Sequence, residues 1–186
     1  MKKNYKFMIE PQNIITETTM ALIPYYTDTA NLHCQMVGKY GDINIQESSL
    51  HILKESCLFY GCDFDGSLQS SRKILEGQKI LPIMVSVEFE YCMIPLSSPM
   101  KKDCIWIAFQ HIGRIIPDGE NSIILFKNQD MLEVNITKSS LDSRINKASR
   151  LVCTYHFRRK MVKDLRNRNL TVAEERRDYE KGQGDW

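Results

Sequence analysis

The sequence lacks any apolar run that approaches the roughly 20 residues needed to cross a bilayer. Its basic start, Met1-Lys2-Lys3-Asn4-Tyr5-Lys6, is followed by Glu10-Pro11-Gln12-Asn13, where a secretory signal peptide needs its apolar stretch. It also contains no internal repeat and no low-complexity linker. These absences predict a cytoplasmic protein without a membrane segment. The composition of the 186 residues, 42% hydrophobic and 26% charged, is typical of a soluble globular chain.

Motifs for catalysis and metal binding are absent as well. There is no Gly-x4-Gly-Lys phosphate loop, no dinucleotide-binding glycine pattern and no H-E-x-x-H helix. The 6 cysteines do not have the paired spacings of a zinc site. The closest two, Cys57 and Cys62, have four residues between them and no matching second pair. We therefore expect free thiols, no metal, no cofactor and no catalytic residue.

What the sequence does contain is a strong charge asymmetry. The formal net charge is only +2, but residues 139–168 carry nine Lys or Arg and two Asp, a local net charge of +7. The preceding 138 residues carry 13 basic and 16 acidic side chains. The positive field of residues 139–168 attracts polyanions, largely independently of the total charge of the chain.

The spacing within residues 139–168 predicts an amphipathic helix. At about 100° per residue, Ile145, Ala148, Val152 and Tyr155 form one apolar stripe, and Lys147, Arg150 and Arg158 lie on the opposite side. Such a helix would dock by one face and present cations on the other. This pattern alone leaves two interpretations open, a contact with nucleic acid or another polyanion and a plain solvated surface.

The rest of the chain predicts an α+β domain with a mostly antiparallel sheet, a middle helix and a basic C-terminal helix. Ser48 and Gly61 would bound the middle helix over about 49–60, residues 65–75 are helical in part, and Ser139 or Ser140 would cap the last helix. Pro24 would stop the second strand. The expected strands are residues 6–9, 19–23, 32–37, 85–93, 104–109, 123–126 and 131–136, the last two forming a hairpin.

Several blocks resemble a known family when taken in order. They are Ser56-Cys57-Leu58-Phe59-Tyr60-Gly61 with Gly66, Pro82-Ile83-Met84-Val85, Pro95-Leu96-Ser97-Ser98-Pro99, Cys104-Ile105-Trp106-Ile107 and His111-Ile112. Their order and spacing over roughly residues 15–160 resemble the competence transcription factor family, ComK. This resemblance implies a cytoplasmic activator of the DNA-uptake genes that binds paired A/T tracts as a homo-oligomer, mainly through the minor groove.

The C-terminal end departs from that resemblance. The family has a longer segment with aromatic residues for assembly and for contact with a proteolytic adaptor, which the resemblance therefore implies as a partner. We expect a single ComK-like DNA-binding domain over residues 1–165 and a polar tail over residues 166–186 that is shortened or atypical. The tail supports one alternative, a C-terminally altered regulator that acts as a protein-interaction module with impaired DNA binding or activation. RNA binding is a third hypothesis, although no aromatic strand pair typical of RNA-binding sheets is evident.

The predicted DNA contacts all lie in the basic stretch. Arginine suits the narrow, strongly negative minor groove of A/T tracts, so Arg158 and Arg159 are the leading candidates for groove or backbone contact. Phosphate contacts are expected from Lys147, Arg150, Lys160 and Lys163. Arg144 is expected to pair with Asp142 or with a neighbouring subunit.

Overall fold

The computed structural model describes residues 13–182, with side chains for residues 13–166 and for Arg168. The chain divides into two units, Met1–Val152 and Cys153–Trp186. The first unit holds the sheets, two helices and the start of α3 (Lys138–Gly182). The second unit is helical over its described residues. The strand expected over residues 6–9 lies outside the described part of the chain.

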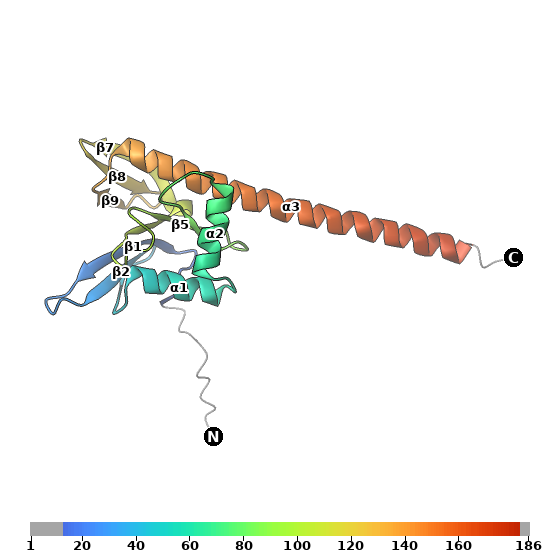
Figure 1. Ribbon diagram of the computed structural model, residues 1–186, viewed down its shortest axis with the longest axis horizontal. Helices are drawn as coiled ribbons and strands as arrows, with labels where there is room; N and C mark the ends of the chain where they lie inside the picture. Colours follow the sequence, from blue (N-terminus) through green and yellow to red (C-terminus); the bar gives the residue numbers. More distant parts are fainter. Residues whose placement is uncertain (1–12, 183–186) are drawn as a thin grey trace, which may run out of the picture. The chain divides into compact units, whose positions relative to one another are not determined.

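Two antiparallel sheets make up most of the first unit (Figure 1). Among the described residues, the larger sheet has six strands in the order β3-β2-β1-β6-β5-β4, and the smaller has the order β7-β8-β9. The fold is therefore α+β with mostly antiparallel strands, a middle helix and a C-terminal helix, as the sequence predicts. The strands are β1 (Thr19–Tyr26), β2 (Leu32–Gly38), β3 (Ile43–Ile45), β4 (Ile83–Ser86), β5 (Tyr91–Pro95), β6 (Trp106–Ala108), β7 (Ile112–Asp118), β8 (Asn121–Phe126) and β9 (Met131–Val134). The remaining elements of this unit are α1 (Ser49–Phe59), α2 (Phe64–Ile74) and the 3-10 turn η2 (Phe109–His111).

Strand β6 lies in the middle of the larger sheet, between β1 and β5. All three of its residues are buried, which confirms the covered central strand predicted from its continuous apolar run. Ile107 points into the cluster between the two sheets. Because successive side chains alternate across a strand, Trp106 and Ala108 point to the opposite face. Both faces of the larger sheet are therefore covered.

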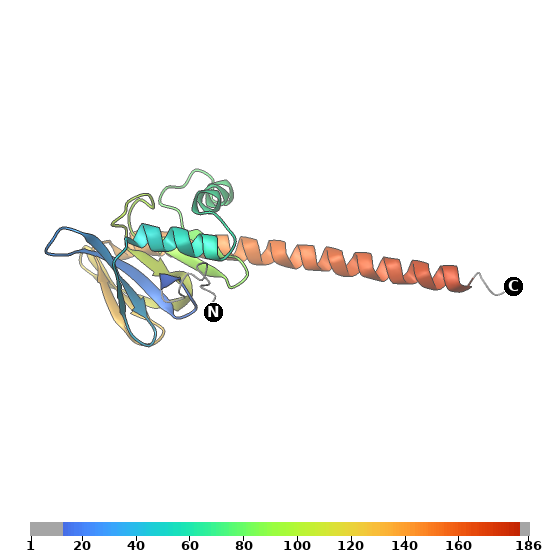
Figure 2. The same cartoon turned by 90° about the horizontal axis from the view of Figure 1, so that it is seen from below.

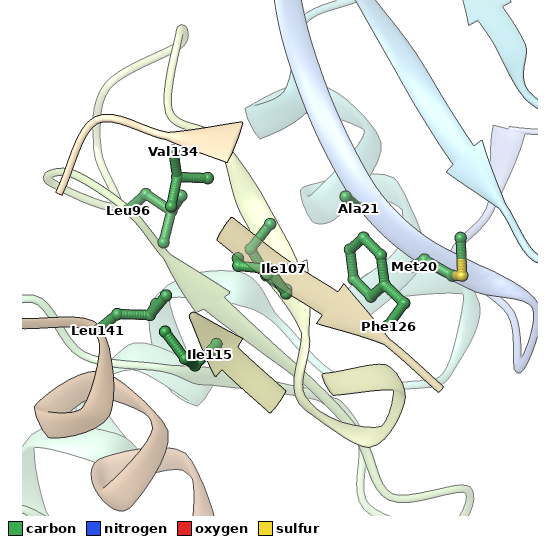
Figure 3. Packing of buried hydrophobic residues seen from close by; sticks show 9 residues of the cluster. Met20, Ala21, Leu96, Ile107, Ile115, Phe126, Val134 and Leu141 are labelled. Carbon is green, nitrogen blue, oxygen red and sulfur yellow. The ribbon is translucent and has the colours of Figure 1, made fainter. Parts of the chain in front are cut away.

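The core between the sheets is built from residues of many elements (Figure 3). Met20 and Ala21 of β1, Ile107 of β6 and Phe126 of β8 pack together in it. Leu141 belongs to the same cluster, and it comes from the first turn of α3. The start of α3 is thus part of the core of the first unit. The other buried members are Leu96, Ile115, Ile124 and Val134.

Helix α1 packs on β1 and β4 of the larger sheet (Figure 2). Specific polar contacts hold it there. The side chain of Ser48 accepts a hydrogen bond from the backbone N–H of His51, which confirms the predicted cap. The buried Ser56 hydroxyl accepts from the N–H of Ile15 and donates to the carbonyl of Ile52. Gly61 follows the helix with a φ of 76°. It occupies the left-handed region that glycine adopts at least cost, so the helix ends where the sequence predicts.

Pro24 does not end β1, contrary to expectation. The strand continues to Tyr26, with Pro24 opposite Cys34 of β2. On its other side, β1 pairs with β6 only at Ala21 and Leu22. At Pro24 the strand therefore has an unpaired edge, which is where a residue without an N–H is tolerated.

The single strand expected over residues 85–93 is also wrong. The chain reverses there, so that β4 ends at Ser86 and β5 begins at Tyr91, with the two strands paired to each other. The turn between them includes Phe89, whose side chain is 58% exposed, and Glu90, with a φ of 58°. No Gly or Pro marks this turn in the sequence, and its alternating residues imitate a strand.

The other predicted turns are confirmed. Pro117 and Asp118 end β7, and Gly119 adopts a φ of 59° before β8 begins. Strands β8 and β9 form the expected hairpin, with Gln129 at a φ of 76° in the connection. In the turn between β7 and β8, proline, aspartate and glycine are a direct sequence signal for a turn.

The cysteines are free thiols, as expected. Cys34, Cys57, Cys92 and Cys104 are buried, and burial raises the pKa of each. For Cys34 the pKa rises to about 12. These four thiols therefore stay protonated and act as small apolar side chains near neutral pH. Cys153 differs because it is exposed.

Trp106 provides a test of this core. Trp106→Ala is expected to lower the free energy of unfolding by about 3–5 kcal/mol, because it leaves a large cavity behind a fully buried ring. Trp106→Phe should cost less, since it keeps a ring and removes an indole N–H that has no hydrogen-bond partner among the described residues. Urea unfolding followed by circular dichroism measures both. Equal stability of Trp106→Ala and the wild type would contradict the central position of β6.

Candidate nucleic-acid interface

The predicted DNA contacts lie on α3, whose first turn is capped by Thr137. The Thr137 hydroxyl accepts a hydrogen bond from the N–H of Ser140 at 3.3 Å, and its carbonyl accepts from the N–H of Leu141. The prediction of Ser139 or Ser140 as the cap is therefore wrong, because the cap is Thr137. Thr, Ser and Asp side chains all serve this role, so a run such as Thr137-Lys138-Ser139-Ser140 leaves the boundary open by one or two residues.

The helix is anchored in the first unit by one apolar stripe. Leu141, Ala148 and Leu151 are fully buried, and counted at about 100° per residue they lie within a sector of about 80°. Ile145 is partly buried and packs against the same cluster. The predicted stripe is thus confirmed at Ala148 and Ile145, but the buried side is rotated by about 30° toward Leu151.

Arg144 lies on the buried side of this helix. It falls within about 40° of Ala148 at 100° per residue, and its guanidinium donates a hydrogen bond to the carbonyl oxygen of Pro95 at 3.0 Å. Burial lowers the pKa of Arg144, and the nearby Cys104 opposes this effect. The expected pair with Asp142 is wrong, because Asp142 forms a salt bridge with Lys138 at 2.5 Å. Arg144 joins α3 to the end of β5.

Lys147 lies at the margin of the buried stripe, about 100° from Ala148. Its ammonium group donates a hydrogen bond to the carbonyl oxygen of Lys79 at 2.6 Å. The pKa of Lys147 is lowered, mainly by burial and further by the positive charge of Arg144. A neighbouring anion would offset both effects, because it stabilises the charged form of the ammonium.

Arg150 lies on the far side of the helix from Ala148 and is exposed. Together with Lys147 it lines an open cleft of about 750 Å³ in the first unit. The structure therefore brings together the two cations of this unit that the sequence predicts to contact phosphate. Every residue that lines the cleft has a polar or charged side chain, and the others are Gln78, Lys138, Ser139, Asp142, Ser143 and Asn146.

Sequence reasoning did not find Gln78 as part of this cleft. Gln78 lies in the connection between α2 and β4, far from α3 in the chain. Only the packing of that connection against α3, seen in the Lys147–Lys79 hydrogen bond, brings it to the cleft. Asn146 and Ser143 lie one turn apart on the helix and were open to prediction from their spacing.

The four predicted contacts in the second unit do not share one side of the helix. Arg159, Lys160 and Lys163 line a shallow depression of about 320 Å³ together with His156 and Asp164. Counted at about 100° per residue, Arg158 lies about 140–160° from Lys163 and Lys160, on another side of the helix, and its guanidinium lies 5.9 Å from the centre of the Tyr155 ring. The structure thus groups three of these cations and separates the fourth from them.

The comparison with protein families identifies the chain. Residues 10–160 match the family described as ComK protein. This match covers most of the 186 residues, including both sheets, α1, α2 and the first half of α3. The class of protein is therefore a competence transcription factor, and the chain belongs to the ComK family.

The other comparisons add no relative. Neither the search of curated proteins nor the search of solved structures found a match. Within the described residues, no helix has the length and apolar character to span a bilayer, and no three His, Cys, Asp or Glu side chains gather where they could hold a metal ion.

Arg144 and Arg150 differ in a way that unfolding measurements can test. Arg144→Ala is expected to lower the free energy of unfolding by about 1–2 kcal/mol, because it removes a charged hydrogen-bond donor from the half-buried contact with Pro95. Arg150→Ala, a matched change of an exposed arginine on the same helix, should leave the stability nearly unchanged. Urea unfolding of the two variants checks this. Equal losses of stability would refute the anchoring role of Arg144.

Proposed function

We propose that this protein is a DNA-binding activator of the competence genes that binds A/T-tract promoter sites as a homo-oligomer, largely through the minor groove. The observation that carries the proposal is the cleft of the first unit, where the anchored start of α3 presents Lys147 and Arg150. Membership of the ComK family gives the regulatory context. The cytoplasm is the compartment in which such a regulator acts.

The chemistry of the cleft suits a sugar–phosphate backbone. Lysine and arginine release condensed counterions when they contact phosphates, which supplies most of the non-specific affinity. Ser139, Ser143, Asn146 and Gln78 add neutral donors, which bind phosphate oxygens and fix the register of a protein on DNA. In the second unit, Arg159, Lys160 and Lys163 offer a second set of cations on one side of the helix.

Specificity for A/T tracts follows from groove shape rather than from a base-edge code. Such tracts have a narrow minor groove with enhanced negative potential, into which arginine inserts favourably. Arg159 is the leading candidate for this contact because it lies among the other cations of the second unit. Arg158 stays a predicted contact, although its side chain points away from that group.

A titration of three labelled nucleic acids tests the proposal. The protein should bind an A/T-tract duplex more tightly than a random duplex, and both more tightly than single-stranded RNA. If about six phosphates are contacted, the affinity for duplex DNA should fall about a thousandfold between about 50 and 200 mM salt. Fluorescence anisotropy at the two salt concentrations measures this. Equal binding to all three would leave only a generic cationic surface.

The same titration distinguishes minor-groove from major-groove recognition when inosine replaces adenine and cytosine replaces thymine in the A/T tract. An inosine–cytosine pair lacks the amino group that guanine places in the minor groove, so its minor-groove edge resembles that of an A·T pair, whereas its major-groove edge resembles that of G·C. A minor-groove binder keeps most of its affinity for the substituted tract. Loss of binding to the level of the random duplex would contradict the minor-groove proposal.

Changing both Arg158 and Arg159 to alanine should weaken binding to the A/T-tract duplex and leave the thermal stability almost unchanged. The slope of log affinity against log salt should fall by about one for each phosphate contact removed. The matched control is Lys101→Ala with Lys102→Ala, which removes two cations from the connection between β5 and β6, outside both groups of predicted DNA contacts. The single variants then assign the effect to Arg158 or to Arg159. A large loss of folding in the double variant would show that the pair is structural.

A further inference from the structure

Four aromatic rings gather at the surface of the first unit, where Phe59 and Phe89 are exposed and Tyr60 and Tyr91 are half-buried. Tyr60 contacts Phe59, Phe89 and Tyr91 edge to face, with ring centres 5.1–5.7 Å apart. Phe89 and Tyr91 stack with an angle of 22° between their planes. Phe89 is 58% exposed and Phe59 is 50% exposed, and Leu58, which precedes Phe59 in α1, is 57% exposed. We call these five side chains the aromatic patch.

The aromatic patch is held in place rather than loosely displayed. The Tyr60 hydroxyl donates to the carbonyl of Ile15 at 2.9 Å, which fixes the central ring. The Ser86 hydroxyl accepts from the backbone N–H of Phe89 at 3.3 Å and holds the turn that carries this residue. Since rigid aromatic side chains lose little conformational entropy on binding, such a surface is suited to recognition.

Acidic residues neighbour the patch, two of them next to Phe89 along the chain and one near Tyr91. Glu88 and Glu90 flank Phe89 in the turn, and the backbone of Glu17 hydrogen-bonds to the phenol of Tyr91. A base stacked on these rings would bring its phosphate beside these carboxylates, and like charges repel. The aromatic patch is therefore suited to an apolar partner that carries positive charge, because aromatic faces and carboxylates both attract cations.

The second unit carries an exposed apolar stripe with positively charged residues beside it. Phe157, Met161 and Leu165 are 66%, 52% and 51% exposed. They recur every four residues along the helix, which places them on one side. At about 100° per residue they lie about 120–160° from Arg159 and from Lys163, two of the cations that line the depression. Arg158 borders the stripe. We call Phe157, Met161 and Leu165 the helix stripe.

We propose that the aromatic patch of one molecule binds the helix stripe of a second copy of this chain. The contact deepens the homo-oligomer part of the proposed function and gives it a surface. At about 100° per residue the stripe lies about 120–160° from Arg159 and Lys163, so these two proposed DNA contacts remain exposed in the assembly. Arg158 and Lys160 flank the stripe and lie at the edge of the contact.

Complementarity on both surfaces argues for a second copy as the occupant. Both surfaces are apolar, and contiguous exposed apolar groups on a folded protein are typical of interfaces. Their surroundings have opposite charge, with glutamates around the patch and arginine and lysine around the stripe. The two surfaces differ from each other, so a single patch-to-stripe contact is not symmetric by itself. It closes into a dimer when each molecule gives its stripe to the patch of the other, and otherwise it forms rings or chains.

Sedimentation velocity without DNA tests the contact. The full-length wild type should self-associate, and Phe89→Ser and Met161→Ser should each raise the dissociation constant at least about tenfold, as expected for side chains at the centre of an interface. The matched controls are Tyr40→Ser and Met131→Ser, which change an aromatic residue and a methionine that are exposed elsewhere in the first unit. The controls should associate as the wild type does. Circular dichroism establishes that all four variants are folded.

Mixing the two interface variants distinguishes this contact from other modes of assembly. Phe89→Ser keeps its stripe and Met161→Ser keeps its patch, so a mixture retains one intact contact and should associate more strongly than either variant alone. A weakening by Met161→Ser but not by Phe89→Ser would indicate stripe-to-stripe pairing and overturn the proposal. A monomeric wild type at concentrations up to about 0.1 mM would also overturn it.

The test is independent of the DNA-binding proposal. Self-association is measured without nucleic acid, and DNA binding by each variant is then measured on a short duplex that holds one A/T tract. Loss of association with unchanged binding to this duplex supports the inference and leaves the proposed function standing. Normal association without DNA binding would refute the proposed function alone.

Discussion

The packing of the start of α3 into the core of the first unit is the constraint on which the proposed interface depends. Leu141, Ala148 and Leu151 are fully buried, and Arg144 ties the same helix to the end of β5 through the Pro95 carbonyl. With the rotation of the helix fixed in this way, Lys147 falls at the margin of the buried side and Arg150 on the far side. The cleft that holds both cations results from this anchoring, not from the charge density of the segment alone.

Much of the fold could be predicted from local signals. Ser48 and Gly61 bounded α1, the continuous apolar run of β6 indicated a covered strand, and Pro117-Asp118-Gly119 marked a turn. The failures lie where such signals conflict or are missing. The turn around Phe89 has alternating apolar and polar residues and a non-glycine residue at positive φ, so its sequence resembles a strand. Pro24 is tolerated because β6 is too short to pair with it, a fact of tertiary structure.

The candidate interface could also be predicted only in part, because local signals indicated some of its residues and tertiary packing determined the others. Charge asymmetry indicated the right helix, and helical spacing predicted that Ala148 would face the core and Arg150 the solvent. Spacing alone did not show that Arg144 would be half-buried with a carbonyl partner, since the true buried side is rotated toward Leu151. Gln78 could not be predicted from the sequence, because it lines the cleft only through the packing of the connection between α2 and β4 against α3.

The helix in the second unit offers a cationic surface and an apolar one, and this has a thermodynamic consequence. A single exposed helix has many accessible orientations and side-chain conformations, and any ligand that seats one face restricts them. The ligand for the other face then meets a helix that is already ordered, so its own binding loses less entropy. Such linkage is reciprocal: subunit assembly would strengthen attachment to the promoter, and the promoter would favour assembly, without any change in the shape of either surface.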